Sequence, residues 1–340
     1  MTNILLIYTG GTIGMKEGSR DGALRPFDFD GIKDEVPELR KFSINIESYT
    51  FDPLIDSSDV EPHLWIRLAE LIRDNYEKYD GFVILHGTDT MAYSASALSF
   101  MLEGLGKSVI FTGSQLPIGK ARTDGKENLI SAIEIAAAKN AQGRAMVPEV
   151  CICFNSQLLR GNRSVKVNAT GFDAFKSPNY PPLATAGIDI SYNNAFIRKN
   201  PSTPFRINTS LDTRVSILKV HPGITEQVVR DILLGNGSRA VIIETYGSGN
   251  AISKPWFLNI LKEARQRGKI LLNVTQCLSG NVNMNLYATG VALKNAGVVS
   301  GFDITTESAL GKLFFLLGNE PDNMKVRKLL GSNLKGEITK

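Results

Sequence analysis

The sequence predicts an α/β protein with two domains. The larger N-terminal domain is expected to contain a mostly parallel, doubly wound sheet, and the C-terminal domain to be a smaller α/β unit. The chain has 340 residues, which is long for one ordinary domain and comfortable for two. Short β-branched runs alternate with longer amphipathic stretches, as in a parallel sheet covered by helices. The alternation stops in a polar, proline-marked stretch and then restarts.

The N-terminal domain is expected over residues 1–192. Its first strand is the continuous apolar run 4–8, which Thr-Gly-Gly follows. Apolar residues recur at helical spacing over 61–79, where Pro62 suits a first helical turn. Further strands are predicted at 81–86, 109–113 and 150–154, and further helices at 90–105 and 128–139.

Residues 193–213 are interpreted as a linker, because asparagine and proline cluster there without apolar periodicity. The C-terminal domain is then expected over 214–340, a usual domain size. Its strands are predicted at 215–220, 240–245 and 270–274, and its helices at 225–234 and 254–267, with further helical segments up to the end.

Composition excludes several classes of function. The net charge of +4 comes from 38 basic and 34 acidic residues that are scattered along the chain, so no nucleic-acid surface is predicted. No apolar stretch is long enough to span a membrane, and the N-terminus lacks the features of a signal peptide. Three cysteines suit a reducing compartment. The sequence therefore predicts a cytoplasmic protein that binds neither nucleic acid nor membranes.

No metal site is predicted. Cys151 and Cys153 share one face of a strand, but no second pair of Cys or His residues lies nearby to complete a zinc site. We interpret both cysteines as strand packing.

Sheets of this kind place their sites beyond the carboxyl ends of the strands. The first polar motif there is residues 9–14, whose glycines allow a tight turn and bring backbone N–H groups close to a bound group. Its spacing is not a dinucleotide fingerprint. Thr12 is thus a candidate nucleophile, and the polar segment 15–25 a candidate lid. A purely structural turn would give the same motif.

The second motif is residues 86–90, at the end of another predicted strand. A threonine hydroxyl such as that of Thr88 needs a base before it attacks. Asp89 could orient such a base or bind a substrate ammonium group. The alternative is that Thr88 or Asp89 only caps the next helix. His86 is interpreted as a packed strand-end residue rather than a base.

Two further groups are candidates. Asp56, Ser57, Ser58 and Asp59 precede the Pro62 helix. Helix capping would explain one or two of the four, and a solvated turn needs no function, but Asp and Ser together suit the two head groups of an amino acid. Lys166 could act as a base in a dry site, although an exposed loop lysine is the alternative.

Taken together, residues 9–14, 56–59, 86–90 and 112–115 resemble, in order and in strand-end placement, the motifs of the bacterial-type L-asparaginases. Residues 160–163, 171–175, 246–250 and 276–277 resemble the cytoplasmic type I branch, so the resemblance covers nearly the whole chain. It implies hydrolysis of L-asparagine to L-aspartate and ammonia, with no cofactor and no metal. It also implies a homodimer or homotetramer with sites near the subunit contact.

The resemblance assigns roles to individual residues. Thr12 matches the usual nucleophile of the family, and Thr88, Asp89 and Lys166 match its second threonine–aspartate–lysine group. Ser57 falls where the family binds the substrate α-carboxylate, and Asp89 also where it binds the α-amino group.

Other matches lie around this group or in the second domain. Asp56 and Ser58 flank the substrate site and are expected to contribute to it. Asn250 matches a position that approaches the site from the neighbouring subunit in some members. Many members carry a tyrosine in the loop after the first threonine, but residues 22–26 contain none. Tyr287 is the candidate replacement.

Some type I enzymes bind asparagine at a separate activating site. Thr275 and Cys277 fit that pattern, but Glu244 stands where an arginine is expected. A carboxylate would repel the carboxylate of the effector rather than pair with it. We therefore expect weak or absent activation.

Three alternatives stay open at this point. A glutaminase would share the chemistry. The asparaginase-like subunit of a tRNA amidotransferase usually carries an extra N-terminal domain, for which a strand beginning at Ile4 leaves no room. A non-catalytic amino-acid sensor would not need Thr12, Thr88 and Lys166 together.

Overall fold

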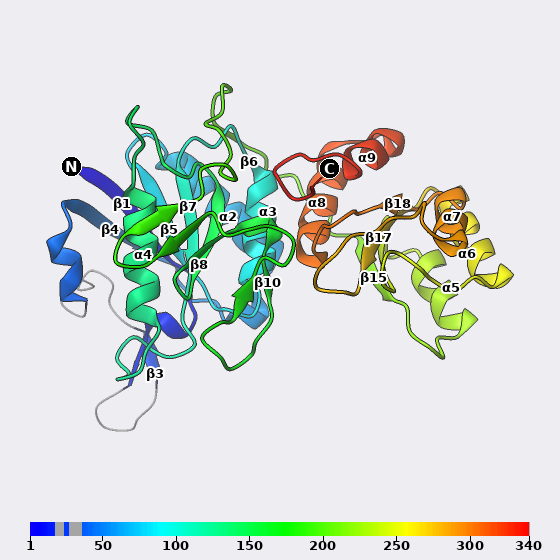
Figure 1. Cartoon of the computed structure of the whole chain (residues 1–340), viewed down its shortest axis with the longest axis horizontal. Coiled ribbons are helices and arrows are strands. Elements are labelled where there is room, and N and C mark those ends of the chain that lie inside the picture. Colours follow the sequence, from blue (N-terminus) through cyan, green and yellow to red (C-terminus); the bar gives the residue numbers. More distant parts are fainter. Residues whose placement is uncertain (18–23, 27–35, 340) are drawn as a thin grey trace. The chain divides into compact units, whose positions relative to one another are not determined.

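The computed structural model describes residues 1–17, 24–26 and 36–339. The chain divides into two compact units, Met1–Thr209 and Ser210–Lys340. The boundary between them lies within the stretch 193–213. Each unit has its own sheet and its own hydrophobic core, which confirms the prediction of two α/β domains (Figure 1). None of the helices in the described ranges has the length and apolar character needed to cross a membrane.

The sheet of the first unit has eight strands in the order β13-β12-β9-β8-β7-β5-β1-β4. They are β1 (Thr2–Tyr8), β4 (Ile44–Thr50), β5 (Gly81–Leu85), β7 (Ser108–Thr112), β8 (Val150–Phe154), β9 (Gln157–Arg160), β12 (Ala184–Ala186) and β13 (Ile190–Tyr192). The pairs from β8 to β4 are all parallel, whereas β9, β12 and β13 pair antiparallel. The sheet is therefore mixed, with a parallel part that carries the predicted strands.

The chain reverses direction after β8 in a two-residue turn. Asn155 and Ser156 both have positive φ angles, 47° and 61°. Two such residues form the tight turn that matches the twist of a β-hairpin. This turn explains why β9 returns antiparallel beside β8.

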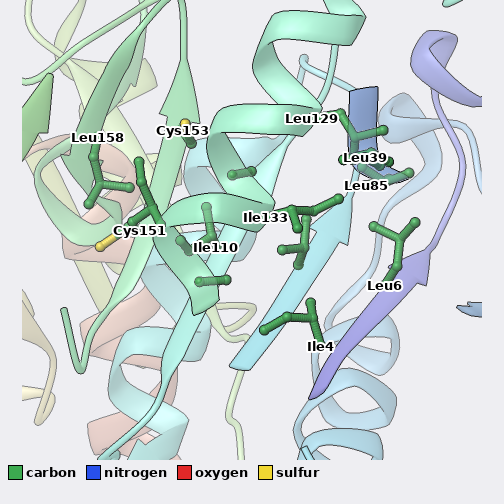
Figure 2. Close-up of a cluster of buried hydrophobic side chains, with 14 of the residues drawn as sticks. Ile4, Leu6, Leu39, Leu85, Ile110, Leu129, Ile133, Cys151, Cys153 and Leu158 are labelled. Atoms are coloured by element: carbon green, nitrogen blue, oxygen red, sulfur yellow. The ribbon is translucent and has the colours of Figure 1, made fainter. Parts of the chain in front are cut away.

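One face of the sheet packs on helix α4 (Gly125–Ala137). Figure 2 shows Ile4 and Leu6 of β1 in the same buried cluster as Leu129 and Ile133 of α4. The intervening residues of β1 point to the opposite face and are buried as well. Burying each such side chain contributes about 1.5–3 kcal/mol. Both faces of the sheet are thus covered at its centre, where the strand ends are left to form a site.

All three helices in this unit end earlier than predicted, α4 at Ala137 instead of residue 139 and the other two by more. Helix α2 (Pro62–Asp74) stops before residue 79 because the Asn75 side-chain amide donates to the Leu71 carbonyl at 2.9 Å, replacing the next backbone bond. Helix α3 (Met91–Met101) stops before residue 105 because Leu102–Glu103 forms a short strand, β6, that pairs with β14 (Arg206–Ile207). The difference in α2 arises from a side chain that replaces a backbone donor, and that in α3 from pairing with a distant segment.

The shorter elements of the first unit lie in its loops. They are the strands β2 (Met15–Glu17), β3 (Leu24–Pro26), β10 (Val165–Lys166) and β11 (Phe175–Lys176), and the 3-10 helices η1 (Thr12–Gly14), η3 (Pro37–Lys41), η4 (Ser57–Asp59) and η5 (Gly161–Arg163). Strand β2 pairs antiparallel with β3, and β10 with β11.

The second unit has a four-stranded parallel sheet in the order β15-β16-β17-β18. Its elements are β15 (Val215–Lys219), α5 (Glu226–Leu234), β16 (Ala240–Thr245), α6 (Pro255–Gln266), β17 (Ile270–Thr275), α7 (Ala288–Asn295), β18 (Val299–Ser300), α8 (Thr306–Asn319) and α9 (Asn323–Leu330). Helices α5 and α6 contribute the apolar residues that pack against the sheet. The predicted strands and helices of this domain are all present, within a residue or two.

A buried ion pair ties the C-terminal segment to helix α8. Lys312 Nζ lies 2.5 Å from a Glu337 carboxylate oxygen, and both side chains are fully buried. Lys312 also donates to the carbonyls of Leu330 and Ser332 at 3.0 and 2.6 Å. Glu337 accepts from the Leu334 backbone N–H at 3.0 Å. Every charge is therefore compensated locally, as a buried pair requires.

Candidate active site

The order of the strands reverses between β1 and β5. From β1 the chain passes to β4 on one side, and then crosses to β5 on the other. Open α/β sheets bind ligands at such a point, beyond the carboxyl ends of the strands. A cavity of about 480 Å³ lies here. It is lined by Gly10, Gly11, Thr12, Met15, Leu54, Ile55, Asp56, Ser57, Gly87, Thr88 and Asp89.

Three glycines let the loops around this cavity approach one another. A Cβ on Gly10 would lie 2.1 Å from the Ile55 carbonyl oxygen, and one on Gly11 would lie 2.6 Å from the Cα of Gly87. A Cβ on Gly87 would lie 2.5 Å from the Ser57 Cβ. Gly10 and Gly11 also have φ angles of 138° and 94°, which other residues rarely adopt. Structure alone thus accounts for the glycines, but it does not require the hydroxyl of Thr12.

Thr12 begins the 3-10 turn η1 and lines the cavity. The Tyr8 hydroxyl, at the end of β1, donates to the Gly11 carbonyl at 3.3 Å and braces this turn. Burial raises the pKa of Tyr8 well above its usual value, so the hydroxyl keeps its proton and stays a donor. The predicted lid over 15–25 falls in part outside the described residues; in the described part, the backbone of β2 pairs with β3.

Thr88, Asp89 and Lys166 are brought together although Lys166 is far away in sequence. Its Nζ donates to Thr88 Oγ1 at 2.8 Å and to an Asp89 carboxylate oxygen at 2.6 Å. The Lys166 side chain is 18% exposed and that of Asp89 is 64% exposed. Lys166 is therefore not the exposed loop lysine that the sequence left open. An ion pair whose carboxylate is this exposed adds little stability. Its main effect is to direct the Lys166 amine at the Thr88 hydroxyl.

The loop before helix α2 supplies the opposite wall. Ser57 is buried, and its hydroxyl lies 3.5 Å from the second carboxylate oxygen of Asp89. Thr90 holds this loop by donating to the Ser57 carbonyl at 2.7 Å. Asp56 accepts from the backbone N–H and the hydroxyl of Ser58, both at 2.9 Å, and these bonds lower the pKa of Asp56. Asp56 lines the cavity, whereas Ser58 is not among the lining residues.

His86 is a packed strand-end residue, as predicted. It is buried; its Nδ1 lies 2.7 Å from the Gly87 carbonyl and its Nε2 lies 2.9 Å from the Ser94 hydroxyl. Burial lowers the pKa of His86 to about 4, so the ring is neutral near pH 7. The carbonyl can only accept, so Nδ1 carries the proton and Nε2 accepts from Ser94. Trp65 in turn donates to Ser94 at 2.9 Å.

Gln115 also lies at this site. It belongs to the motif 112–115 of the sequence, to which no role was assigned. It follows β7, the strand next to β5, and its Oε1 accepts from the Thr88 hydroxyl at 3.4 Å. The signal that could have identified it is its position, since residues after neighbouring parallel strands meet at one edge.

In the second unit, the two candidate effector residues lie side by side. Thr275 Oγ1 donates to the Gly247 carbonyl at 2.6 Å, and the Cys277 backbone N–H donates to Thr275 Oγ1 at 3.1 Å. Glu244 lies near the end of β16, the strand beside β17, and accepts from the Thr306 hydroxyl at 2.7 Å. The Glu244 carboxylate is therefore already hydrogen-bonded within the second unit.

Asn250 and Tyr287 also belong to the second unit. The Asn250 side-chain oxygen accepts from the Thr289 hydroxyl at 2.6 Å. Tyr287 is the N-cap residue of α7 and is 55% exposed. Their expected contributions to the cavity of the first unit stay predictions.

The three cysteines are free and differ in access. Cys151 and Cys153 are buried in β8, whereas Cys277 is exposed. Burial raises the pKa of Cys153 to about 12 and that of Cys151 well above its usual value. Among the described residues, no group of three or more His, Cys, Asp or Glu side chains could hold a metal ion.

The chain is similar to known proteins along its whole length. The family model "Asparaginase, N-terminal" matches residues 3–198, and "Glutaminase/Asparaginase C-terminal domain" matches residues 214–330. L-asparaginase 1 of Escherichia coli (strain K12) is 45% identical, with 99% of this chain and 98% of that protein covered. The 60 kDa lysophospholipase of Homo sapiens is 42% identical over 99% of this chain, which covers 61% of that protein.

A solved structure extends the likeness to the fold. The crystal structure of L-asparaginase I from Vibrio cholerae O1 biovar eltor str. N16961 matches with a TM-score of 0.89 and 43% identity, covering 99% of each chain. The similarity includes both units and the strand-end loops that form the cavity. This chain therefore belongs to the asparaginase family.

Proposed function

We propose that this protein is an L-asparaginase that hydrolyses L-asparagine to L-aspartate and ammonia. The observation that carries the proposal is the contact of the Lys166 amine with the Thr88 hydroxyl, at 2.8 Å, beside a cavity that Thr12 also lines. A hydroxyl next to an amine can be activated by loss of its proton. The names of the E. coli and V. cholerae relatives support the same substrate.

The cavity offers partners for both head groups of an amino acid. The Asp89 carboxylate would bind the α-ammonium group through a charge-assisted hydrogen bond. The Ser57 hydroxyl and backbone N–H groups would hold the α-carboxylate. These two side chains lie 3.5 Å apart, which suits two groups attached to a single carbon atom. Asp56 would complete this wall, with Ser58 supporting it, and Asn250 would approach from a neighbouring subunit.

The reaction we propose has two steps. The Thr12 hydroxyl attacks the side-chain amide carbon of asparagine, the carbon–nitrogen bond breaks, and ammonia leaves with the proton lost by the threonine. A water molecule then hydrolyses the β-aspartyl ester. Thr88 activates this water, with Lys166 as the base. Backbone N–H groups in the strand-end turns would stabilise the oxyanion. Tyr287 is the residue we propose to assist the activation of Thr12.

We also propose that the protein forms a homodimer or homotetramer in the cytoplasm. Leu278, Leu286, Tyr287 and Val291 are exposed apolar residues close in sequence to Thr289, the partner of Asn250. Exposed apolar side chains that share one surface favour burial by a partner, and we propose that these four do. The free cysteines suit the reducing conditions of the cytoplasm.

Ammonia release from asparagine and from glutamine, measured side by side on one preparation, tests the proposal. We expect release from asparagine with an equal amount of aspartate, and a loss of at least about 100-fold in kcat for Lys166→Met. Faster release from glutamine would favour a glutaminase or an amidotransferase subunit. Binding of asparagine without release would show an amino-acid sensor instead and would contradict the proposal.

A further inference from the structure

We propose that Gln115 is a positioning residue that biases the direction of the Thr88 hydroxyl proton and thereby shifts the acid limit of activity. This inference rests on the proposed role of Lys166 as the base. It concerns a side chain that is not among the described residues lining the 480 Å³ cavity. Gln115 therefore acts on the reaction through Thr88 rather than by touching asparagine.

The backbone of Gln115 is held firmly. Its N–H lies 3.0 Å from one carboxylate oxygen of Asp124, and the Leu116 N–H donates to the other at 3.1 Å. The side chain spans two loops: Nε2 donates to the Gly171 carbonyl at 3.0 Å, and Oε1 accepts from Thr88 at 3.4 Å. The side-chain amide thus makes two hydrogen bonds, one to Gly171 and one to the Thr88 hydroxyl, on a backbone that Asp124 holds.

The orientation of the amide follows from what each group can donate. A carbonyl oxygen only accepts, so the Gln115 NH₂ group must face Gly171. The other end of the amide, which only accepts, then faces Thr88. The Lys166 amine, when charged, can only donate to Thr88, at 2.8 Å. The Thr88 hydroxyl therefore accepts a hydrogen bond from Lys166 and donates one to Gln115.

Catalysis needs the hydrogen bond between Lys166 and Thr88 to run in the opposite direction. For Lys166 to act as a base, its amine must be neutral and Thr88 must donate to it. The Thr88 proton must therefore swing from Gln115 to Lys166. At 3.4 Å the bond to Gln115 is long and weak, so the swing costs little free energy. Gln115 favours the charged amine at rest without blocking its conversion.

Three other charged groups lie near Thr88, Lys166 or Gln115. The Asp89 carboxylate lies 2.6 Å from the Lys166 amine. The Asp124 carboxylate is occupied by backbone N–H groups. Arg122 lines a separate cavity of about 570 Å³, together with Gln115 and Gly171. Replacing Gln115 changes the hydrogen bonding of Thr88 and leaves these three charges in place.

Two variants should shift the pH dependence in opposite directions. Gln115→Met removes the acceptor, so Thr88 becomes free to donate to a neutral amine, and the acid limb of kcat should move down by about half a pH unit. Gln115→Glu keeps an acceptor and adds a negative charge, so the acid limb should move up by a similar amount. The KM for asparagine should change less than about twofold, because the substrate contacts are intact.

The measurement is a kcat profile against pH for both variants, with Gln157→Met, an exposed glutamine on β9, as the matched control. NMR of labelled lysine side chains should follow the deprotonation of Lys166 in parallel and show the same two shifts. The inference would be overturned if the acid limb moved in the same direction in both variants, or did not move in either. A large rise in KM with an unshifted profile would show a substrate contact instead and would also overturn it.

The failure of the proposed function would look different. An unmodified chain that releases no ammonia, but whose Lys166 signal shifts in opposite directions in the two variants, would contradict the function and support the proton arrangement. Thermal midpoints close to that of the unmodified chain would show that the variants are folded. Should Gln115→Met not fold, an upward shift in Gln115→Glu supports the inference, and its absence contradicts it.

Discussion

Thr12 and Thr88 follow neighbouring strands, β1 and β5, and both line one cavity. The Thr88 hydroxyl has the Lys166 amine at 2.8 Å, whereas Thr12 lies on the glycine turn, braced by Tyr8. Two hydroxyls with such different surroundings are suited to different steps. The order of the steps can therefore be tested with single substitutions.

Thr88→Ala should trap the β-aspartyl ester on Thr12, because the ester forms but the water that hydrolyses it lacks its activating group. Thr12→Ala should form no ester at all. Turnover should fall by at least about 100-fold in both variants. Mass spectrometry of the intact protein and of its peptides after mixing with asparagine would locate the adduct. An ester on Thr88 in the Thr12→Ala protein would mean that the two roles are exchanged.

His86 should make the stability of the first unit depend on pH. Its pKa is about 4 in the folded chain, against an ordinary value of 6.5, so the unfolded chain binds the extra proton between these values. The free energy of unfolding should therefore fall as the pH drops from 6.5 to 4, by about 3 kcal/mol in all. Above pH 6.5 the contribution is constant.

Thermal midpoints measured across this range would test that dependence. His86→Gln cannot titrate, so its midpoint should fall less steeply with pH than that of the unmodified chain. His221→Gln, at an exposed histidine, is the control and should keep the original slope. Parallel slopes for His86→Gln and the unmodified chain would show that His86 is not the group responsible.

Loops and strands, rather than single side chains, determine the shape of the cavity. Gly11→Ala should destabilise the protein and remove most activity, because the new Cβ would lie 2.6 Å from the Cα of Gly87 at a φ of 94°. Gly143→Ala is a matched control, with a φ of 74° and nothing within 4 Å of the new Cβ. The positive φ costs about 1–2 kcal/mol in either variant. Equal losses of thermal stability would mean that the collision between the loops is unimportant.

Most of the strands that were predicted correctly are buried on both faces; β15, with one fully buried residue, is the exception. Strand β5 reads as a continuous apolar run, which needs no partner to be recognised. Strand β4 was missed because it is polar and partly exposed at the edge of the sheet. Strands β10 and β6 have two residues each and exist only through pairing with a distant segment. Local pattern cannot reveal such strands.

The difference between local pattern and long-range contact also decides which site residues could be predicted. Thr12 and Thr88 each follow a buried strand, so the rule of strand ends identifies them. The contact of Lys166 with Thr88 depends on the pairing of β10 with β11, which the sequence does not display. The role of Gln115 depends on one carbonyl, that of Gly171, which orients its amide. Such contacts come from tertiary structure alone.

On the scale of the whole molecule, the second unit raises the question of regulation. Glu244 stands where the family resemblance leads us to expect an arginine for the carboxylate of an effector. Burial raises the pKa of Glu307, and the nearby carboxylate of Glu244 adds to the increase, so this region is rich in carboxyl groups. Lys219, at 3.8 Å from Glu244, is the cation of its ion pair. An anionic effector would meet carboxylates there.

The rate should therefore depend hyperbolically on asparagine concentration. Steady-state rates over a wide range of concentrations, for the unmodified chain and for Thr275→Val and Cys277→Ala, would test this. The three curves should agree in shape, because no activating site is used. A sigmoidal curve that either substitution made hyperbolic would contradict the prediction.

The different access of the cysteines has a practical consequence. Thiol reagents act on exposed thiolates, and Cys151 and Cys153 are buried in β8 with raised pKa values. A maleimide dye should then attach at Cys277 without any engineering of the chain. Because Cys277 contacts Thr275, such a dye would report by fluorescence whether any small molecule settles in the second unit, independently of turnover.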